Sequence, residues 1–327
     1  MKKIFLSILL CVAVLVVYGC SGGKPRSGSL TIYSTLDSDF VEELGREFLQ
    51  KRQLPLAVQV ISKLDDEGAD ADLVLTEMRE LADFSHEDLL LPLAGPCIGK
   101  LAGKFKAGDN SWAGVFYDPL VCLVNHDFAN SFGTEKLQSW EQLCQDLPVR
   151  LIVQNFNTPA VQRSLLCGFV SELGEDGAFE LMRKVDRNAH KYVSFPFTSV
   201  RLVVSGDGDA ALVRRSQVFR YLEQEFPAFV LTPQEGTPAV LYGAGVLKAG
   251  SQPEAAAQFV DWLLQDSDVR RINLRNDTGL VFLLNHGTGT PLVRPERVWL
   301  NTKYSSWTER DRLSQKWLRE IRFSSNN

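Results

Sequence analysis

Short apolar runs alternate with amphipathic stretches along most of the chain from Leu30 onward. Residues 30–33 form a strand-like apolar run, and residues 37–51 place apolar side chains at helical spacing. Two more apolar runs, at residues 56–61 and 71–75, predict the next strands. The regular exchange of strands and helices predicts an α/β fold with helices flanking largely parallel sheets.

The same alternation continues in the rest of the chain. Residues 112–125 form a long apolar run that Pro119 interrupts, so we expect this segment to leave one sheet and enter another. Residues 253–264 carry apolar side chains on one helical face. Further strands are predicted at residues 149–153, 210–213 and 239–248, and an Arg-rich loop is predicted after residue 213. Further helices are predicted at residues 78–83, 159–173, 178–185 and 308–321.

The first twenty residues are arranged like a secretory signal. Lys2 and Lys3 precede an apolar run at residues 4–17, which is shorter than the roughly 20 residues that a membrane-spanning helix needs. Residues 17–20 (VYGC) resemble the bacterial lipobox, which implies cleavage before Cys20 and acylation of that cysteine, and a polar tether follows. The alternative is an ordinary signal peptide that is cut nearby, with Cys20 uninvolved.

Charge and cysteine content narrow the function classes. The chain has 40 acidic and 35 basic side chains and a net charge of -5, so we expect no nucleic-acid partner. Four cysteines would remain after processing, without a C-x-x-C pair, and Cys122 lies in an apolar run where a buried role is expected. The four histidines are widely separated, so we expect no metal site and no cofactor. The cysteines that remain are Cys97, Cys122, Cys144 and Cys167.

Several segments in a fixed order resemble one protein family. The chain is similar to type II periplasmic solute-binding proteins, in the branch that includes ferric-ion-binding proteins and relatives for phosphonates, phosphorylated metabolites and thiamine. The resemblance covers residues 30 to about 321. Its landmarks are residues 30–40 (LTIYSTLDSDF), 71–91, 114–125 (GVFYDPLVCLVN), 139–143 (SWEQL) and 243–264.

The resemblance implies two α/β lobes, each a mixed sheet flanked by helices, joined by two crossover strands near residues 117–124 and 236–242. A ligand would bind between the lobes, which close by hinge bending. The expected division is a signal peptide at residues 1–19, a lipid-anchored linker at 20–29, lobe one at 30–118 plus 239–327, and lobe two at 119–238.

Candidate ligand-binding residues follow from the rule that ligands bind beyond the carboxyl ends of strands. Ser34 and Thr35 follow the first strand, although they could only cap the next helix. Glu77 follows the third strand and matches a metal ligand of the ferric branch, although an acidic residue also suits a helix start. In lobe two the candidates are Asn155, Asn157 and Thr158, for which simple helix capping is the alternative.

The segment after Val213 distinguishes iron from other ligands. The ferric branch has an adjacent tyrosine pair there, and the matching positions are Val218 and Phe219, which disfavours bare ferric ion. Arginine suits phosphate, phosphonate or carboxylate, so an anionic organic ligand is expected, unless the arginines only face solvent. The candidates in this segment are Arg214, Arg215, Ser216 and Gln217, and Tyr117 and Tyr242 on the crossovers could line the cleft or pack in the hinge.

The expected function is to capture a small anionic organic solute or an iron complex between the lobes and to deliver it to the permease of an ABC-type importer. The partners would be a small-molecule ligand, the permease subunits, and the bilayer through acylated Cys20, with a monomeric, extracytoplasmic protein. A sensor lipoprotein acting on a membrane histidine kinase is an alternative, as is bare ferric-ion binding. An enzyme such as a secreted hydrolase is not expected, because the sequence has no G-x-S-x-G, H-E-x-x-H or Walker-type motif.

Overall fold

The computed structural model describes residues 28–64, 70–133, 137–143, 145, 148–157, 160–222, 226–284, 293–303 and 306–324. Its main strands are hydrogen-bonded in the order β2-β1-β3-β10-β5-β8-β6-β7. The strands are β1 (Ser29–Ser34), β2 (Ala57–Ile61), β3 (Leu73–Glu77), β4 (Leu90–Leu91), β5 (Trp112–Asn125), β6 (Leu151–Gln154), β7 (Ala189–Val193), β8 (Ala210–Arg214), β9 (Ala228–Leu231), β10 (Thr237–Leu247), β11 (Val281–Phe282) and β12 (Val298–Trp299). The helices are α2 (Ser38–Arg52), α3 (Met78–His86), α4 (His126–Phe132), α5 (Trp140–Leu143), α6 (Ala160–Asp186), α7 (Pro196–Val204), α8 (Arg215–Leu222), α9 (Pro253–Gln265), α10 (Ser267–Arg275) and α11 (Trp307–Trp317), with short turns η1 (Ile98–Lys100), η2 (Gly103–Phe105), η4 (Pro295–Arg297) and η5 (Leu318–Arg322).

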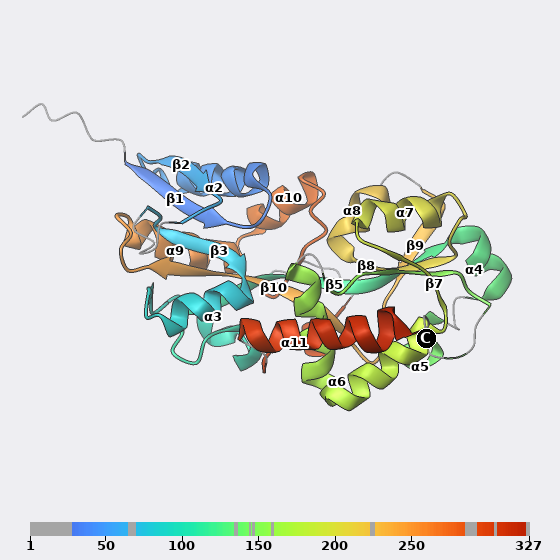
Figure 1. Cartoon of the computed structure of the whole chain (residues 1–327). Coiled ribbons are helices and arrows are strands. Elements are labelled where there is room, and N and C mark those ends of the chain that lie inside the picture. Colours follow the sequence, from blue (N-terminus) through green and yellow to red (C-terminus); the bar gives the residue numbers. More distant parts are fainter. Residues whose placement is uncertain are drawn as a thin grey trace, which may run out of the picture.

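Strand β5 connects two halves of the sheet, which form the two lobes seen in Figure 1. It pairs antiparallel with β10 as far as Pro119, and with β8 from Leu120 onward. The switch at Pro119 confirms the expectation that this segment leaves one sheet and enters another. We call the half built on β1, β2 and β3 lobe one, and the half built on β6, β7 and β8 lobe two.

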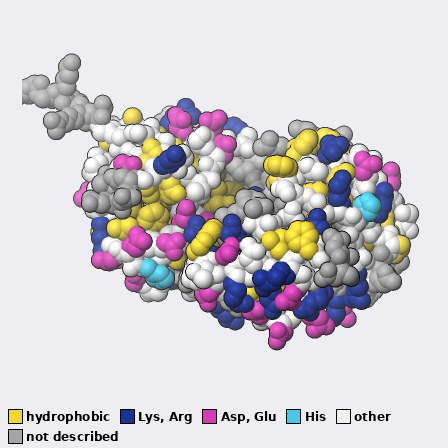
Figure 2. Space-filling model, viewed as in Figure 1, with side chains coloured by type: hydrophobic (Ala, Val, Ile, Leu, Met, Phe, Trp, Pro, Cys, Tyr) yellow, Lys and Arg dark blue, Asp and Glu magenta, His cyan; other side chains and the backbone are white. Residues whose placement is uncertain are grey.

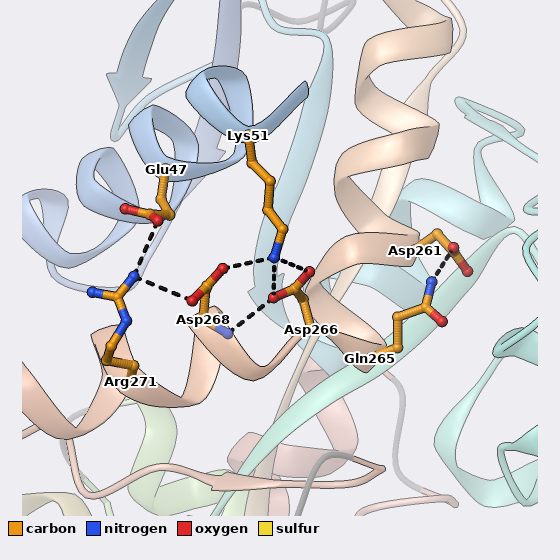
Figure 3. A network of polar contacts seen from close by, with 7 residues as sticks. All are labelled: Glu47, Lys51, Asp261, Gln265, Asp266, Asp268 and Arg271. Carbon is orange, nitrogen blue, oxygen red and sulfur yellow. Dashed lines mark hydrogen bonds and ion pairs between the residues drawn. The ribbon is translucent and has the colours of Figure 1, made fainter. Parts of the chain in front are cut away.

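In lobe one, α2 and α10 are held together by a polar network (Figure 3). The ammonium of Lys51 on α2 donates to Asp266 at 2.8 and 2.9 Å and to Asp268 at 2.7 Å. Arg271 on α10 reaches Glu47 at 3.0 Å. Beneath this network α2 packs its apolar face against the core, as the spacing of residues 37–51 predicted. The network therefore joins α10 to α2, which packs on β2 and β1.

In lobe two, α6 is broken at Gly174, which has φ 74° and ψ 164°. A left-handed backbone of this kind suits glycine because it has no Cβ. The break agrees with the two separate helices predicted from the sequence. Helix α11 packs along α6 and crosses the lower face of Figure 1 from α3 toward α5.

The prediction of an Arg-rich loop after residue 213 is wrong. Helix α8 begins at Arg215, directly after β8, and buries Val218 and Phe219 one turn later. Helices α7 and α10 and strand β7 were also missed. Helix α7 is rich in β-branched valine, which lowers helix propensity, and burial of that face decides its conformation instead.

Cys122 is a buried free thiol, as the sequence predicted, and Cys97 and Cys167 are also free and buried. Cys144, Cys20 and the rest of the signal and linker region lie outside the described residues. Within the described parts, none of the helices has the length and apolar character needed to cross a bilayer. The exact lobe boundaries stay a prediction.

Candidate functional site

The carboxyl ends of β3, β6 and β8 meet between the lobes, next to the crossover strand β5. Glu77 ends β3, Gln154 ends β6 and Arg214 ends β8, while Asp118 lies in the middle of β5. Hydrogen bonds link Asp118, Gln154 and Arg214 directly or through Gln217, so residues far apart in the sequence form one polar cluster. Glu77 is bonded instead to Ser164 on α6. This is the place where open α/β sheets bind ligands.

Asp118 is the centre of the cluster and is fully buried. Its carboxylate accepts hydrogen bonds from Arg214 Nη1 at 2.7 Å, Ser216 N at 2.9 Å and Ser216 Oγ at 2.5 Å. Burial is the largest single influence on the pKa of Arg214 and lowers it, but Asp118 together with smaller contributions from Tyr242 and Glu77 outweighs burial, so the pKa is raised. The guanidinium therefore stays charged, with one edge held by Asp118. Its Nε has no hydrogen-bond partner in the described part of the chain.

Three glutamine side chains form a relay across lobe two. Gln162 on α6 donates to Gln154, whose amide donates to Gln217 Oε1 at 2.8 Å. Gln217 Oε1 also accepts from the backbone N–H of Arg214 at 3.0 Å. Both ends of the relay, Gln162 Oε1 and Gln217 Nε2, are buried without a partner among the residues described. Buried polar atoms rarely stay unsatisfied, so the two ends can serve a bound solute.

Glu77 connects the two lobes. Its carboxyl accepts a hydrogen bond from the hydroxyl of Ser164 on α6. Burial raises the pKa of Glu77, although the Ser164 hydroxyl opposes this by favouring the charged form. Both residues also line a cavity of about 450 Å³ under α11. Glu77 and Ser164, but none of the residues bonded around Asp118, therefore border a space large enough for a small organic molecule.

The remaining residues predicted in lobe one serve local structure. Ser34 donates to Leu75 O at 2.7 Å, and Thr35 is hydrogen-bonded to Thr76 at 2.9 Å. The cap of α2 is Asp37, which accepts from Phe40 N at 3.1 Å, so neither Ser34 nor Thr35 caps that helix.

In lobe two, Asn155 donates to Ser194 Oγ at 3.0 Å, which ties the loop after β6 to the loop after β7. Asn157 is partly exposed beside Asn155. Thr158 lies outside the described residues. The predicted Asn155 and Asn157 are therefore at the interlobe edge of the sheet, without a contact to the polar cluster in the structure.

The two crossover tyrosines are packed. Tyr117 is fully buried and donates to Val293 O at 2.5 Å, and Tyr242 is 8% exposed beside Arg214. Burial raises the pKa of both phenols. Of the two roles weighed for Tyr117, the structure shows packing.

The predicted arginines differ in environment. Arg214 belongs to the cluster, whereas Arg215 donates to Gly279 O and stacks on the Phe219 ring at 4.5 Å. The positions matched to the ferric tyrosine pair hold Val218 and Phe219, both buried. No phenolate is therefore available at these two positions.

Sequence reasoning missed Asp118, Gln154, Gln162 and Ser164. Asp118 had a signal, because it is the one charged residue inside the apolar run of residues 112–125. The others are single polar residues on a strand or a helix, and only the packing of α6 against the strand ends brings them together.

Figure 2 shows Lys and Arg side chains gathered, together with carboxylates, over the face that carries α11 and α6.

Comparisons with known proteins agree with this geometry. The family model described as bacterial extracellular solute-binding protein matches residues 41–272. Iron uptake protein A1 of Synechocystis sp. is 22% identical over 226 residues, which are 64% of this chain and 62% of that protein. The match thus spans less than two thirds of that relative.

Solved structures show the same fold. The periplasmic binding protein AfuA of Actinobacillus pleuropneumoniae, with fructose-6-phosphate bound, is 22% identical with a TM-score of 0.66, covering 91% of this chain and 99% of that one. Iron-bound HitA of Pseudomonas aeruginosa is 17% identical with a TM-score of 0.68, covering 90% and 98%. The expected two-lobed α/β fold and the family resemblance are confirmed. The chain belongs to the bacterial extracellular solute-binding protein family.

Proposed function

We propose that this protein is the substrate-binding component of an ABC-type importer, which holds a small anionic organic solute between its lobes and passes it to membrane permease subunits. The observation that carries the proposal is the set of three buried polar atoms with unfilled hydrogen-bonding capacity, Arg214 Nε, Gln217 Nε2 and Gln162 Oε1, at the carboxyl ends of the strands. Two donors and a fixed positive charge favour an anion with oxygen acceptors. The protein acts by binding, and the solute leaves unchanged.

Bare ferric ion is the less favoured ligand, although the relatives named for iron share the fold. A hard trivalent cation needs several anionic oxygen ligands. Here the tyrosine positions hold Val218 and Phe219, and burial favours the neutral form of Glu77. Asp118 is already occupied by Arg214 and Ser216.

Anchoring is part of the proposal. Acylation of Cys20 would hold the protein at the outer face of the membrane, with the lobes beside the permease. The lipid anchor is inferred from the signal-like first twenty residues, and the monomeric state is inferred from the family resemblance.

Affinity capture tests the proposed function. The full-length tagged chain is expressed in its own cells, and its complexes are captured from solubilised membranes and identified by mass spectrometry. We expect permease and ATPase subunits, more abundant when the solute is present. Capture of a histidine kinase without a permease would contradict the importer role and favour a sensor. Chemical conversion of the bound solute by the purified protein would contradict a binding role.

A further inference from the structure

The cavity under α11 has an unusual charge for a protein with a net charge of -5. Among the described residues that line it, Arg79, Lys104, Lys106 and Arg310 are basic and Glu77 alone is acidic. Because burial favours the neutral form of Glu77, this carboxyl offsets little of the positive charge. The lining of the cavity therefore carries a net positive charge, although Arg79 is paired with Asp83 and Glu80 beside it.

Arg310 is the residue that points most directly to a ligand. It lies in the first turns of α11, is 3% exposed, and lines the cavity. Its Nε and Nη1 atoms have no hydrogen-bond partner anywhere in the described chain. Burial, together with the nearby charge of Arg79, lowers the pKa of Arg310. The guanidinium carbon lies 5.9 Å from the Trp307 ring, but this contact supplies no acceptor for Nε and Nη1. Two buried N–H groups without acceptors are costly, and a bound anion would remove that cost.

Neighbouring carboxylates do not fill this role. Asp83 attracts Arg310 but is bonded to Arg79, with Arg79 Nη1 to Asp83 Oδ2 at 3.2 Å, and its side chain is 48% exposed. Glu77 is bonded to Ser164. Arg79 is thus paired with Asp83 and, at 3.9 Å, with Glu80, whereas Arg310 on the same side of the cavity has no ion pair among the described residues.

Part of the remaining wall is apolar, while His86, Ser164, Asn301 and Thr302 add polar groups. Met78, Ala82, Trp112 and Leu241 contribute hydrophobic surface to the same cavity. A free inorganic ion would leave this surface without contacts. An organic molecule with a compact anionic head and an apolar body would use both halves of the cavity.

We propose that this cavity binds the phosphate or phosphonate head of a small organic molecule, with the head between Arg310 and Arg79 and the body against Trp112 and Met78. The planar guanidinium fork suits phosphoryl oxygens, and a dianion matches two arginines better than a monoanionic carboxylate. This inference rests on the proposed function and narrows its solute class. It also assigns part of the solute site to the C-terminal helix, which carries none of the residues predicted from the sequence.

Titration calorimetry on the purified full-length chain tests the proposal with four probes: phenyl phosphate, phenylphosphonate, benzoate and inorganic phosphate. We expect phenyl phosphate and phenylphosphonate to bind more tightly than inorganic phosphate, which lacks the apolar body, and than benzoate, which lacks the second charge. Arg310→Gln should weaken phenyl phosphate by about tenfold or more. Arg319→Gln, an exposed arginine on η5, is the matched control and should bind like the wild type.

Arg79→Gln is the second variant, because Arg79 is partly exposed and its loss leaves the α11 packing in place. This substitution should also weaken the binding of phenyl phosphate. If Arg310→Gln fails to fold, the affinity of Arg79→Gln tests the proposal on its own. Unchanged affinity in Arg79→Gln and in a folded Arg310→Gln would overturn the proposal. So would benzoate binding as tightly as phenyl phosphate, or no binding of any phosphoryl probe by the wild type. The proposed importer function is tested separately, because the protein could still capture permease subunits in the presence of a different solute.

Discussion

Asp118 holds the interlobe cluster together because it is fully buried and accepts one hydrogen bond from Arg214 at the end of β8 and two from Ser216 at the start of α8. Two charges taken out of water are costly unless each has a well-placed partner. Arg214 supplies that partner, with a side chain only 15% exposed. The pair therefore fixes the orientation of Arg214 at the end of β8.

Asp118→Asn tests this account of the pair. Removing the negative charge leaves the Arg214 guanidinium buried and uncompensated, so we expect the free energy of unfolding to fall by about 3 kcal/mol. Chemical denaturation measures the change. The control is Asp88→Asn, which breaks an exposed pair with Lys248 in a left-handed backbone that asparagine tolerates, and should cost less than about 0.5 kcal/mol. Equal effects of the two substitutions would contradict the account.

Glu77 should make stability depend on pH. Because burial raises its pKa in the folded state, the folded protein holds this proton more tightly than the unfolded chain, and stability falls as pH rises above the unfolded pKa. Glu77→Gln keeps the shape and the Ser164 hydrogen bond but removes the titration. In urea denaturation the variant should gain stability relative to the wild type as pH rises above the unfolded pKa of a glutamate, which is about 4.3. A difference that does not change with pH would show that Glu77 is not desolvated.

At the scale of elements, the attachment of α11 to α6 decides the shape of the cavity. Glu175 on α6 accepts hydrogen bonds from Arg312 at 2.8 and 3.0 Å and from Lys316 at 2.7 Å. These bonds lower the pKa of Glu175 from its ordinary 4.5 to about 2. The stabilisation is therefore present above pH 4.5 and is lost as pH falls toward 2.

Glu175→Gln should lower the free energy of unfolding at neutral pH by about 1 kcal/mol, a modest value because the pair is partly exposed. The rate of amide hydrogen exchange should rise along α11. The loss of stability relative to the wild type should disappear as pH falls toward 2, where Glu175 of the wild type is protonated as well. Glu180→Gln, which breaks an exposed pair with Lys184 on α6 alone, is the control. Equally fast hydrogen exchange along α11 in Glu180→Gln would contradict the role of Glu175 in attaching α11 to α6.

How far the sequence predicts these elements depends on what drives each one. Residues 37–51 and 253–264 carry clear apolar faces, and the structure has α2 and α9 there. Helix α8 could not be predicted, because its start is fixed by the contact of Ser216 with Asp118, almost a hundred residues earlier in the chain. Arg310 had no local signal at all, since its burial comes from the packing of α11 against α6. Strand-end residues such as Glu77 and Arg214 were found because the topology rule applies to any α/β sheet.

At the scale of the whole molecule, lobe one and lobe two also touch between α8 and the segment after α10. Gly279, which follows α10, has φ 68° and lies against the start of α8. A Cβ there would lie 2.7 Å from Phe219 Cβ and 2.8 Å from Ser216 Cα. Arg215 also donates to Gly279 O. The close approach of the lobes therefore requires glycine at this position.

Gly279→Ala should shift the lobes apart. We expect a larger radius of gyration in small-angle X-ray scattering and weaker binding of the solute, because the methyl group clashes across the lobes. Gly206→Ala is the matched control, since Gly206 has φ 76° but open space around a Cβ, so it carries the backbone strain without the clash. The same scattering curve for both variants would mean that Gly279 does not limit closure.

Native mass spectrometry of the protein purified gently from its own cells tests the central claim most directly. If the lobes capture a small anionic solute, the folded protein should carry one small molecule per chain, and denaturation should release that molecule with an unchanged structure. A folded protein that carries no small molecule, even from cells supplied with phosphorylated solutes, would contradict the account.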